Sequence, residues 1–387
     1  MDKVKVLQMP LRNNRGGIAK YILENWRFID RSKFTFDFIT FEKQIDFSDE
    51  LLADGCKIHN VSCLPSEDKK RFYSEIHAIL DEGYDAIHLH TSQWSGTQLE
   101  EIAMERGIPN VIVHSHNITI AVPPEETERY YASRQLHESI KREFSASWRS
   151  YATNLCACSD MAARWLFGDE LADSEVYVLK NAVDIANLSF NKAVREKYRK
   201  ELSLQDSFVI GHVGRFDPQK NHEFVLRLFK ETAKTLPSAH LLLIGGGAGF
   251  DETKALANEY GIASKVSFLG MRGDVAELMQ SMDAFVLPSF FEGLPITLVE
   301  AQTAGLRCLA SNAISLEAKI KPDTLFLPLE VSVWRDALLE TARNGYDRVD
   351  AAAFVTAAGY SIRESVKVVE KLYRGLLKSE PGEIIKL

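Results

Sequence analysis

Strand, loop and helix signals follow one another directly in the stretch Phe208-Val209-Ile210-Gly211-His212-Val213-Gly214-Arg215-Phe216-Asp217-Pro218-Gln219-Lys220-Asn221. The apolar run 208–213 is rich in residues that favour strands and predicts a strand buried on both faces, as in a parallel sheet. The loop after it places Arg215 and Lys220 at the carboxyl end of that strand. Because Asn221 is suited to begin a helix, the stretch predicts a strand–loop–helix unit whose loop carries two cations.

Apolar runs of this kind recur along almost the whole chain. We expect strands at 4–9, 35–41, 57–61, 86–90, 110–114, 154–158 and 176–179 in the first half, and at 208–213, 240–244, 265–269, 284–287, 307–310 and 324–327 in the second. Amphipathic stretches such as 17–28, 69–81 and 95–106 lie between them. This alternation predicts βαβ units and doubly wound parallel sheets, an α/β fold.

The polar stretch 185–206 separates the two series of strands. A chain of 387 residues is also long enough for two domains. We therefore expect two Rossmann-like domains, residues 1–182 and 183–361, with the C-terminal segment 362–387 forming a helix that returns to the first. In such sheets ligands bind at the carboxyl ends of the strands, so we expect the site in a central cleft that both domains face.

Composition narrows the class of protein. The sequence is 45% hydrophobic and 26% charged with a net charge of −8, which is globular and argues against a nucleic-acid partner. Its five cysteines are scattered without metal-binding spacing, as in a reducing compartment. No run approaches the roughly 18 apolar residues of a spanning helix, and the N-terminus lacks the pattern of a signal peptide. We expect a soluble cytoplasmic protein that touches the inner face of the membrane at most peripherally.

A second informative run lies at 286–301, Val-Leu-Pro-Ser-Phe-Phe-Glu-Gly-Leu-Pro-Ile-Thr-Leu-Val-Glu-Ala. A strand is expected to end near Ser289, and a helix to begin near Pro295, with Glu292 in the loop between them. Glu300 then lies one to two turns inside the helix. Two carboxylates placed in this way reach the two ends of an elongated ligand, while the amides of the first helical turn favour a phosphate. The alternative is a pair of helix-surface glutamates with no ligand.

Together these residues resemble the family 4 glycosyltransferases of the GT-B fold. The Glu292-x7-Glu300 spacing in its setting is similar to the signature of that family, and 214–221 is similar to its diphosphate-binding loop. The glycine turn 243–247 and the stretch 268–270 resemble two more of its motifs in the family's order. The specific motifs are concentrated in 214–301, whereas the two-domain plan extends over the whole chain.

The resemblance implies a retaining transfer of a sugar from a nucleotide-diphosphate donor, most commonly a uridine diphosphate sugar. Its catalytic residues would be His116, Arg215, Lys220 and Glu292. Its donor-binding residues would be Gly16, Gly17, Gly214, Gly245, Gly246, Leu269, Gly293, Leu294, Thr297, Leu298 and Glu300. Arg215 and Lys220 would neutralise the diphosphate, Glu300 would hold the ribose, and Glu292 would contact the transferred sugar. The sequence has no Asp-x-Asp motif, so we expect no metal and no other cofactor.

The N-terminal half offers fewer signals. The run 12–17 ends in two glycines before a helix, which lets backbone amides approach a ligand or simply forms a flexible turn. His88 and His114 are expected to be satisfied core residues. His116 lies just beyond His114, at the carboxyl end of the expected strand, where the resemblance implies a polar side chain that positions the transferred sugar. Ser159 and Asn181 are candidates for the acceptor side.

A helix is expected across 129–149, with five basic residues against Glu138 and Glu143 and an apolar row at Leu136, Ile140, Phe144 and Trp148. The row either packs on its own domain or faces a membrane that carries a lipid-linked acceptor.

The expected function is therefore sugar transfer to a saccharide or lipid-linked acceptor in the assembly of a bacterial surface polysaccharide. The alternatives are a nucleotide-sugar epimerase or a phosphorylase of the same fold, and a regulator that binds the nucleotide sugar without turnover.

Overall fold

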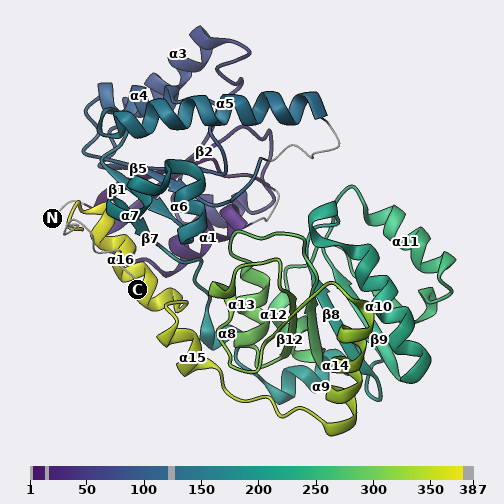
Figure 1. The fold of residues 1–387 in the computed structure, drawn as a ribbon. Helices are drawn as coiled ribbons and strands as arrows, with labels where there is room; N and C mark the ends of the chain where they lie inside the picture. The colour runs from purple at the N-terminus through teal and green to yellow at the C-terminus, as the bar shows by residue number, and fades with distance from the viewer. Residues whose placement is uncertain (1–2, 14–16, 121–126, 378–387) are drawn as a thin grey trace. The chain divides into compact units, whose positions relative to one another are not determined.

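A computed structural model describes residues 3–13, 17–120 and 127–377 of the chain (Figure 1). The chain forms two compact units. Unit 1 comprises Met1–Ala182 and Ile362–Leu387, and unit 2 comprises Val183–Ser361. In the part of the chain that the structure describes, no helix has both the length and the apolarity required to cross a membrane.

Unit 1 is built on a seven-stranded sheet of order β3-β2-β1-β4-β5-β6-β7. Its strands are β1 (Val4–Met9), β2 (Phe34–Thr40), β3 (Ile58–Asn60), β4 (Ala86–Thr91), β5 (Asn110–Ser115), β6 (Asn154–Ala157) and β7 (Val176–Val178). All neighbours pair in parallel, as expected for strands that are apolar on both faces. The strand order reverses between β1 and β4, which is the switch point where ligands of doubly wound sheets bind.

Helices alternate with these strands and bury the sheet. They are α1 (Gly17–Phe28), α2 (Ser48–Ala53), α3 (Lys69–Leu80), α4 (Gln98–Glu105), α5 (Thr127–Ala146), α6 (Asp160–Phe167), α7 (Asp169–Ser174) and the last helix of the chain, α16 (Ile362–Tyr373). Helix α16 packs on α1 and contributes Val366, Val369 and Tyr373 to the core of unit 1 (Figure 1). The C-terminal helix therefore belongs to the unit formed by the beginning of the chain.

Unit 2 repeats the plan with a six-stranded parallel sheet of order β10-β9-β8-β11-β12-β13. Its strands are β8 (Phe208–Val213), β9 (Ala239–Ile244), β10 (Val266–Phe268), β11 (Ala284–Leu287), β12 (Arg307–Ser311) and β13 (Leu325–Leu327). Its helices are α8 (Ile185–Leu188), α9 (Lys192–Glu201), α10 (His222–Thr235), α11 (Phe250–Glu259), α12 (Val275–Ser281), α13 (Ile296–Thr303), α14 (Val331–Asn344) and α15 (Ala352–Ala357). Here the order reverses between β8 and β11, so the loops after these two strands meet at the switch point.

The expected strands lie within one residue of the observed ones, and the two Rossmann-like sheets confirm the predicted fold class. The helix predicted at 95–106 begins later, at Gln98, because Ser95 and Gly96 are poor helix formers and Thr97 occupies the N-cap position. The helix predicted at 129–149 ends at Ala146 and is followed by a 3₁₀ turn at Trp148–Ser150.

The predicted apolar row on α5 is only partly correct. Phe144 and Trp148 are buried, whereas Leu136 is 48% exposed and Ile140 is half-buried. A step of four residues overshoots one turn of 3.6 by about 40°, so residues spaced by four drift around the helix. His137 takes the buried place instead, with its ring stacked on Trp165 at 4.3 Å between centroids.

Candidate active site

The two loops at the switch point of unit 2, 214–221 after β8 and 288–295 after β11, are tied together by hydrogen bonds. The amide of Phe290 donates to the carbonyl of Gln219 at 3.0 Å, and the Gln219 side chain donates back to the carbonyl of Phe291 at 2.9 Å. Asn221 donates to the carbonyl of Pro288 at 3.2 Å while its Oδ1 caps α10. The loops that carry the predicted cations and the predicted Glu292 therefore form one surface.

Lys220 and Glu292 meet at the centre of this surface. The Lys220 Nζ lies 2.5 Å from Glu292 Oε1, and the two residues are only 9% and 7% exposed. Gln219 Nε2 donates to the other carboxylate oxygen at 3.2 Å. A buried charge is tolerated only when it is paired and hydrogen-bonded, so each of these two groups depends on the other. Replacement of Lys220 alone would leave the Glu292 carboxylate buried without its charged partner and would therefore disturb folding.

Arg215 differs from Lys220 in its surroundings. Its side chain is 59% exposed, and its only ion pair among the described residues is with Asp217, at 3.0 Å. An exposed pair of this kind contributes little to stability. The Arg215 guanidinium is thus free to turn toward an anion that arrives at the carboxyl ends of the strands.

Glycines allow the neighbouring loops to approach this region closely. Gly245 has a φ of 141°, and a Cβ at this position would lie 1.9 Å from the carbonyl oxygen of Gly214. The Gly214 amide donates to Ile244 at 3.0 Å, and Phe216 donates to Gly246 at 2.9 Å. The predicted glycine turn after β9 therefore lies directly against the loop that carries Arg215, and it has no room for a side chain at Gly245.

The chain around α13 supplies the remaining predicted donor residues of the second loop. Glu300 is 5% exposed and Leu294 is 7% exposed, and Gly293 is also buried. The amide of Leu298 donates to the carbonyl of Pro295 at 3.0 Å in the first helical turn. The hydroxyl of Thr297 is buried and has no partner in the part of the chain that the structure describes. Leu269 is half-buried, and its amide pairs with Leu243.

Two histidines lie beneath Lys220 and were not identified from the sequence as site residues. His212 Nδ1 donates to the carbonyl of Val286 at 2.9 Å, and His222 stacks on Phe216 at 4.0 Å between centroids. Burial lowers the pKa of His212 to about 4 and that of His222 to about 2, with Lys220 adding to both shifts. Both rings are neutral at pH 7 and add no charge beside Lys220. The signal was present, since His212 alternates with apolar residues on β8 just before the cationic loop.

The predicted residues of unit 1 have diverse surroundings. Gly16 lies outside the described residues, and Gly17 is the first residue of α1. Ser159 is fully buried and caps α6 by accepting from the Ala162 amide at 3.2 Å, so its hydroxyl already has a structural partner. Asn181 is buried, and its Oδ1 has no partner among the residues that the structure describes.

His116 is part of a larger cluster at the switch point of unit 1. His88 and His90 on β4, His114 on β5 and His116 just beyond β5 all lie near the carboxyl edge, beside Gln8 of β1. His88 is a satisfied core residue as expected. His114 is only half satisfied, because its Nε2 has no partner among the described residues. Polar residues at inward-facing positions of three apolar strands indicate such a cluster in the sequence. The cluster is not predicted when each strand is considered separately, because its members come from different strands.

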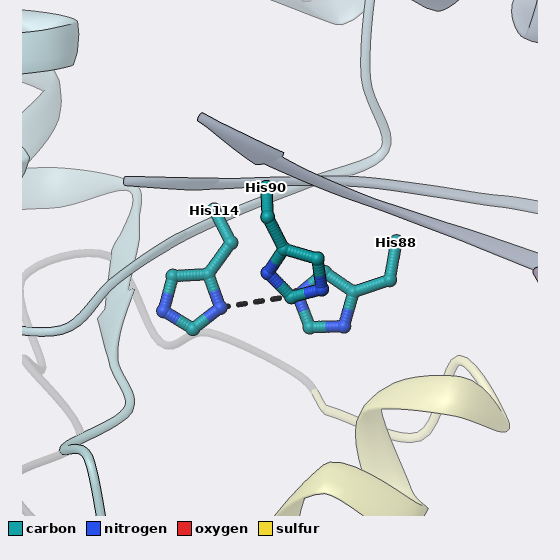
Figure 2. Close-up of side chains that lie close together, drawn as sticks. All are labelled: His88, His90 and His114. Atoms are coloured by element: carbon teal, nitrogen blue, oxygen red, sulfur yellow. Dashed lines mark hydrogen bonds between the residues drawn. The ribbon is translucent and has the colours of Figure 1, made fainter. Parts of the chain in front are cut away.

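Two groups of side chains in the described parts of the chain lie close enough together to hold a metal ion. The first is His88, His90 and His114 (Figure 2). The second is Asp37, His59 and Glu82, where the Lys5 and Lys57 ammonium groups already pair with the carboxylates. Figure 2 shows His88 hydrogen-bonded to His114, and both nitrogens of His88 and of His90 have partners. A metal would have to replace these bonds, so neither group fits an ion well.

Known proteins are similar to this chain in sequence and in architecture. The model for "Glycosyl transferases group 1" matches residues 194–323, and that for "Glycosyltransferase Family 4" matches residues 15–187. A Bacillus subtilis protein described as "Putative glycosyltransferase EpsF" is 31% identical over 95% of this chain and 96% of its own length. The Escherichia coli UDP-Gal:alpha-D-GlcNAc-diphosphoundecaprenol alpha-1,3-galactosyltransferase is 25% identical over 80% of each chain. The crystal structure of Anabaena Alr3699/HepE in complex with UDP-glucose superposes with a TM-score of 0.75 at 18% identity, covering 96% of this chain and all of that one.

Two α/β units, each built on a doubly wound parallel sheet, together with the similarity to known glycosyltransferase structures, place the protein in the GT-B class. The chain belongs to the group 1 family of glycosyltransferases, as its similarity to the Bacillus subtilis relative over nearly the full length of both proteins shows.

The neutral, buried histidines make stability depend on pH. The unfolded chain binds a proton at each histidine below a pKa of about 6.5, whereas folded His212 stays neutral down to about pH 4, so the free energy of unfolding must fall as the pH drops through this window. Between pH 7.5 and 5.5 we expect His212 alone to account for about 1.4 kcal/mol of the loss. In His212→Asn, whose amide can still donate to Val286, the loss in unit 2 should be smaller by that amount in urea titrations. Equal losses in the variant and the unmodified protein would contradict a neutral His212.

Proposed function

We propose that the protein transfers a sugar, with retention of anomeric configuration and without a metal ion, from a uridine diphosphate sugar to a saccharide or lipid-linked acceptor of a bacterial surface polysaccharide. The observation that carries this proposal is the buried Lys220–Glu292 pair, flanked by the exposed Arg215. This arrangement presents two cations to an anionic ligand at the switch point of unit 2. The names of the Escherichia coli and Anabaena relatives support the choice of donor.

In this proposal each site residue binds a different part of the donor. Arg215 and Lys220 bind the diphosphate, Glu300 binds the ribose, and Glu292 contacts the sugar. The chain segments that line the rest of the donor carry Gly16, Gly17, Gly214, Gly245, Gly246, Leu269, Gly293, Leu294, Thr297 and Leu298. Lys220 then exchanges part of its bond to Glu292 for a phosphate oxygen, which leaves Glu292 an acceptor for sugar hydroxyls.

The chemistry is a displacement at the anomeric carbon. The bond from that carbon to the phosphate oxygen breaks, and the acceptor oxygen forms the new bond on the same face. The leaving phosphate oxygen takes the acceptor's proton, so no protein base is needed. Negative charge grows on the departing diphosphate, and fixed cations aimed at it lower the barrier. His116 positions the sugar, while Ser159 and Asn181 lie on the acceptor side. Helix α5, which carries four basic residues against three glutamates and leaves Leu136 exposed, is the surface we propose for peripheral contact with a membrane that carries the acceptor.

The direct test begins with a thermal-shift panel of nucleotide sugars, because a ligand at 100 times its Kd stabilises the protein by about 2.7 kcal/mol. The donor that it identifies is then incubated with saccharide and lipid-linked acceptors, and the product linkage is assigned by NMR. Transfer with retained configuration is expected. Isomerisation of the donor without an acceptor would identify an epimerase, and tight binding without turnover would identify a regulator.

Arg215→Ala should impair catalysis while leaving the fold intact. Removal of a donor aimed at developing charge costs about a hundredfold or more in kcat, whereas loss of an exposed side chain changes stability by less than about 0.5 kcal/mol. Steady-state kinetics and urea unfolding measure the two effects. The control is Arg227→Ala, which removes an exposed arginine of α10 and should do neither. Unchanged turnover in Arg215→Ala would remove Arg215 from the diphosphate site.

Activity should survive chelation. If the two protein cations take the place of a metal, excess EDTA should leave the initial rate unchanged within about twofold, since no divalent ion stabilises the leaving group. The rate is measured after dialysis against EDTA and again after addition of Mg²⁺ or Mn²⁺. Loss of activity that either ion restores would establish a metal requirement.

Replacements of the two glutamates should have different kinetic effects. Glu300 is proposed to bind ribose, which does not change during the reaction, so Glu300→Ala should raise the donor KM more than it lowers kcat. Glu292 faces the sugar as positive charge develops on its ring, so Glu292→Gln should chiefly lower kcat. The glutamine keeps an oxygen that can accept from Lys220, and thermal unfolding of both variants serves as the control for folding. A defect in KM alone in both variants would make Glu292 a binding residue only.

A further inference from the structure

A continuous chain of hydrogen bonds connects His116 to the C-terminal helix within unit 1. His116 Nε2 lies 2.8 Å from His90 Nδ1, and His90 Nε2 lies 2.8 Å from Gln8 Oε1. Gln8 Nε2 donates to the Tyr373 hydroxyl at 2.7 Å, which lies 2.9 Å from His88 Nδ1, and His88 Nε2 lies 3.1 Å from His114 Nδ1. We call these six residues, Gln8, His88, His90, His114, His116 and Tyr373, the histidine network.

The orientation of the Gln8 amide determines which nitrogen of His90 and of His116 carries the proton. The amide oxygen of Gln8 only accepts, so His90 must donate from Nε2, and the Nδ1 of a neutral His90 is then an acceptor. His116 must in turn donate from Nε2 to His90, which leaves its Nδ1 without a proton. Rotation of the Gln8 amide by 180° would reverse every step and place the proton of His116 on Nδ1.

These rings can be treated as neutral. Burial lowers the pKa of His88, His90 and His114 well below its ordinary value, with the neighbouring imidazoles adding to the shift, and burial lowers that of His116 to about 3. Tyr21 packs edge-on against the network, with its ring centroid 4.8 Å from that of His114 and 5.2 Å from that of His116. Ring orientation and proton position are therefore both restricted.

Three atoms at the end of the network have no partner in the residues that the structure describes: His116 Nδ1, His114 Nε2 and the hydroxyl of Tyr21. All three atoms are themselves buried, but His116 as a residue is half-buried, and it lies beyond the carboxyl end of β5, where ligands of such sheets bind. A bare imidazole nitrogen at this place accepts a hydrogen bond from a hydroxyl, the group that a sugar presents.

We propose that Gln8 is a positioning residue that acts through His90 to hold His116 in the Nε2–H tautomer, so that His116 Nδ1 accepts a hydrogen bond from a hydroxyl of the transferred sugar. The part that concerns the sugar rests on the function proposed above. The part that concerns the tautomer is a property of unit 1 alone and can be measured without substrate.

The experiment uses the full-length protein with ¹⁵N-labelled histidine and compares Gln8→Met with Tyr373→Phe. Both variants remove polar atoms of the same buried network, so a purely structural role predicts similar effects. Gln8→Met removes the oxygen that fixes His90. Tyr373→Phe breaks the branch toward His88 and leaves the Gln8–His90–His116 path in place. Long-range ¹H–¹⁵N correlations report which ring nitrogen is protonated, and His116→Gln assigns the His116 signals.

We expect His116 to be protonated on Nε2 alone in the unmodified protein and in Tyr373→Phe, and to show Nδ1 protonation in Gln8→Met. With the donor that the protein uses, kcat should fall by about tenfold in Gln8→Met, the value of one lost hydrogen bond, and by less than about twofold in Tyr373→Phe. A proton on Nδ1 in the unmodified protein, or an unchanged His116 in Gln8→Met, would overturn the proposal. If the tautomers are as expected but kcat is the same in both variants, the role at the sugar is overturned while the tautomer assignment stands. Absence of any transfer would count against the proposed function and not against Gln8.

Discussion

Parallel pairing of the strands is the constraint on which the rest of this protein depends. Because every strand in a sheet points the same way, all carboxyl ends lie at one edge, and every loop that leaves them is presented there. The reversal of strand order between β8 and β11 then brings the loops that follow these two strands together at the switch point. The Lys220–Glu292 pair lies at this reversal in unit 2, and the histidine network lies at the corresponding reversal, between β1 and β4, in unit 1.

The Lys220–Glu292 pair combines structural and functional demands. Two charges removed from water pay a desolvation penalty that only close pairing and further hydrogen bonds offset, and Gln219 contributes one of these. In the function proposed above, the ligand offers Lys220 a second anion and Glu292 a second donor. Arg215, exposed beside the pair, has no comparable structural role. Two cations of one loop thus differ in how far the fold depends on them.

The histidine network shows how a sheet positions polar groups in an apolar interior. Period-2 alternation on β1, β4 and β5 places Gln8, His88, His90 and His114 near one another, and parallel register aligns them. Since burial keeps the rings neutral, the network transmits proton position rather than charge. Tyr373 of the last helix accepts a hydrogen bond from Gln8 in this network. Helix α16 therefore contributes a polar contact to unit 1 as well as core packing.

Much of the secondary structure and of the loop positions could be predicted from the sequence. Apolar runs of a few residues, glycine turns and polar punctuation predicted the strands to within one residue, the two α/β sheets, and the loops that carry Arg215, Lys220 and Glu292. Each of these signals depends on neighbours in the chain, where periodicity and backbone propensity act. Only the tertiary structure decided that Lys220 pairs with Glu292, 72 residues away, and that Gln8 near the N-terminus donates a hydrogen bond to Tyr373 of the last helix. It also decided that the amide of Leu298 is bonded to Pro295, and that α5 buries His137 in place of Leu136. These outcomes depend on which side chains, distant in the sequence, come into contact in the folded core. Local sequence patterns do not contain that information, because those contacts form only when the whole unit folds.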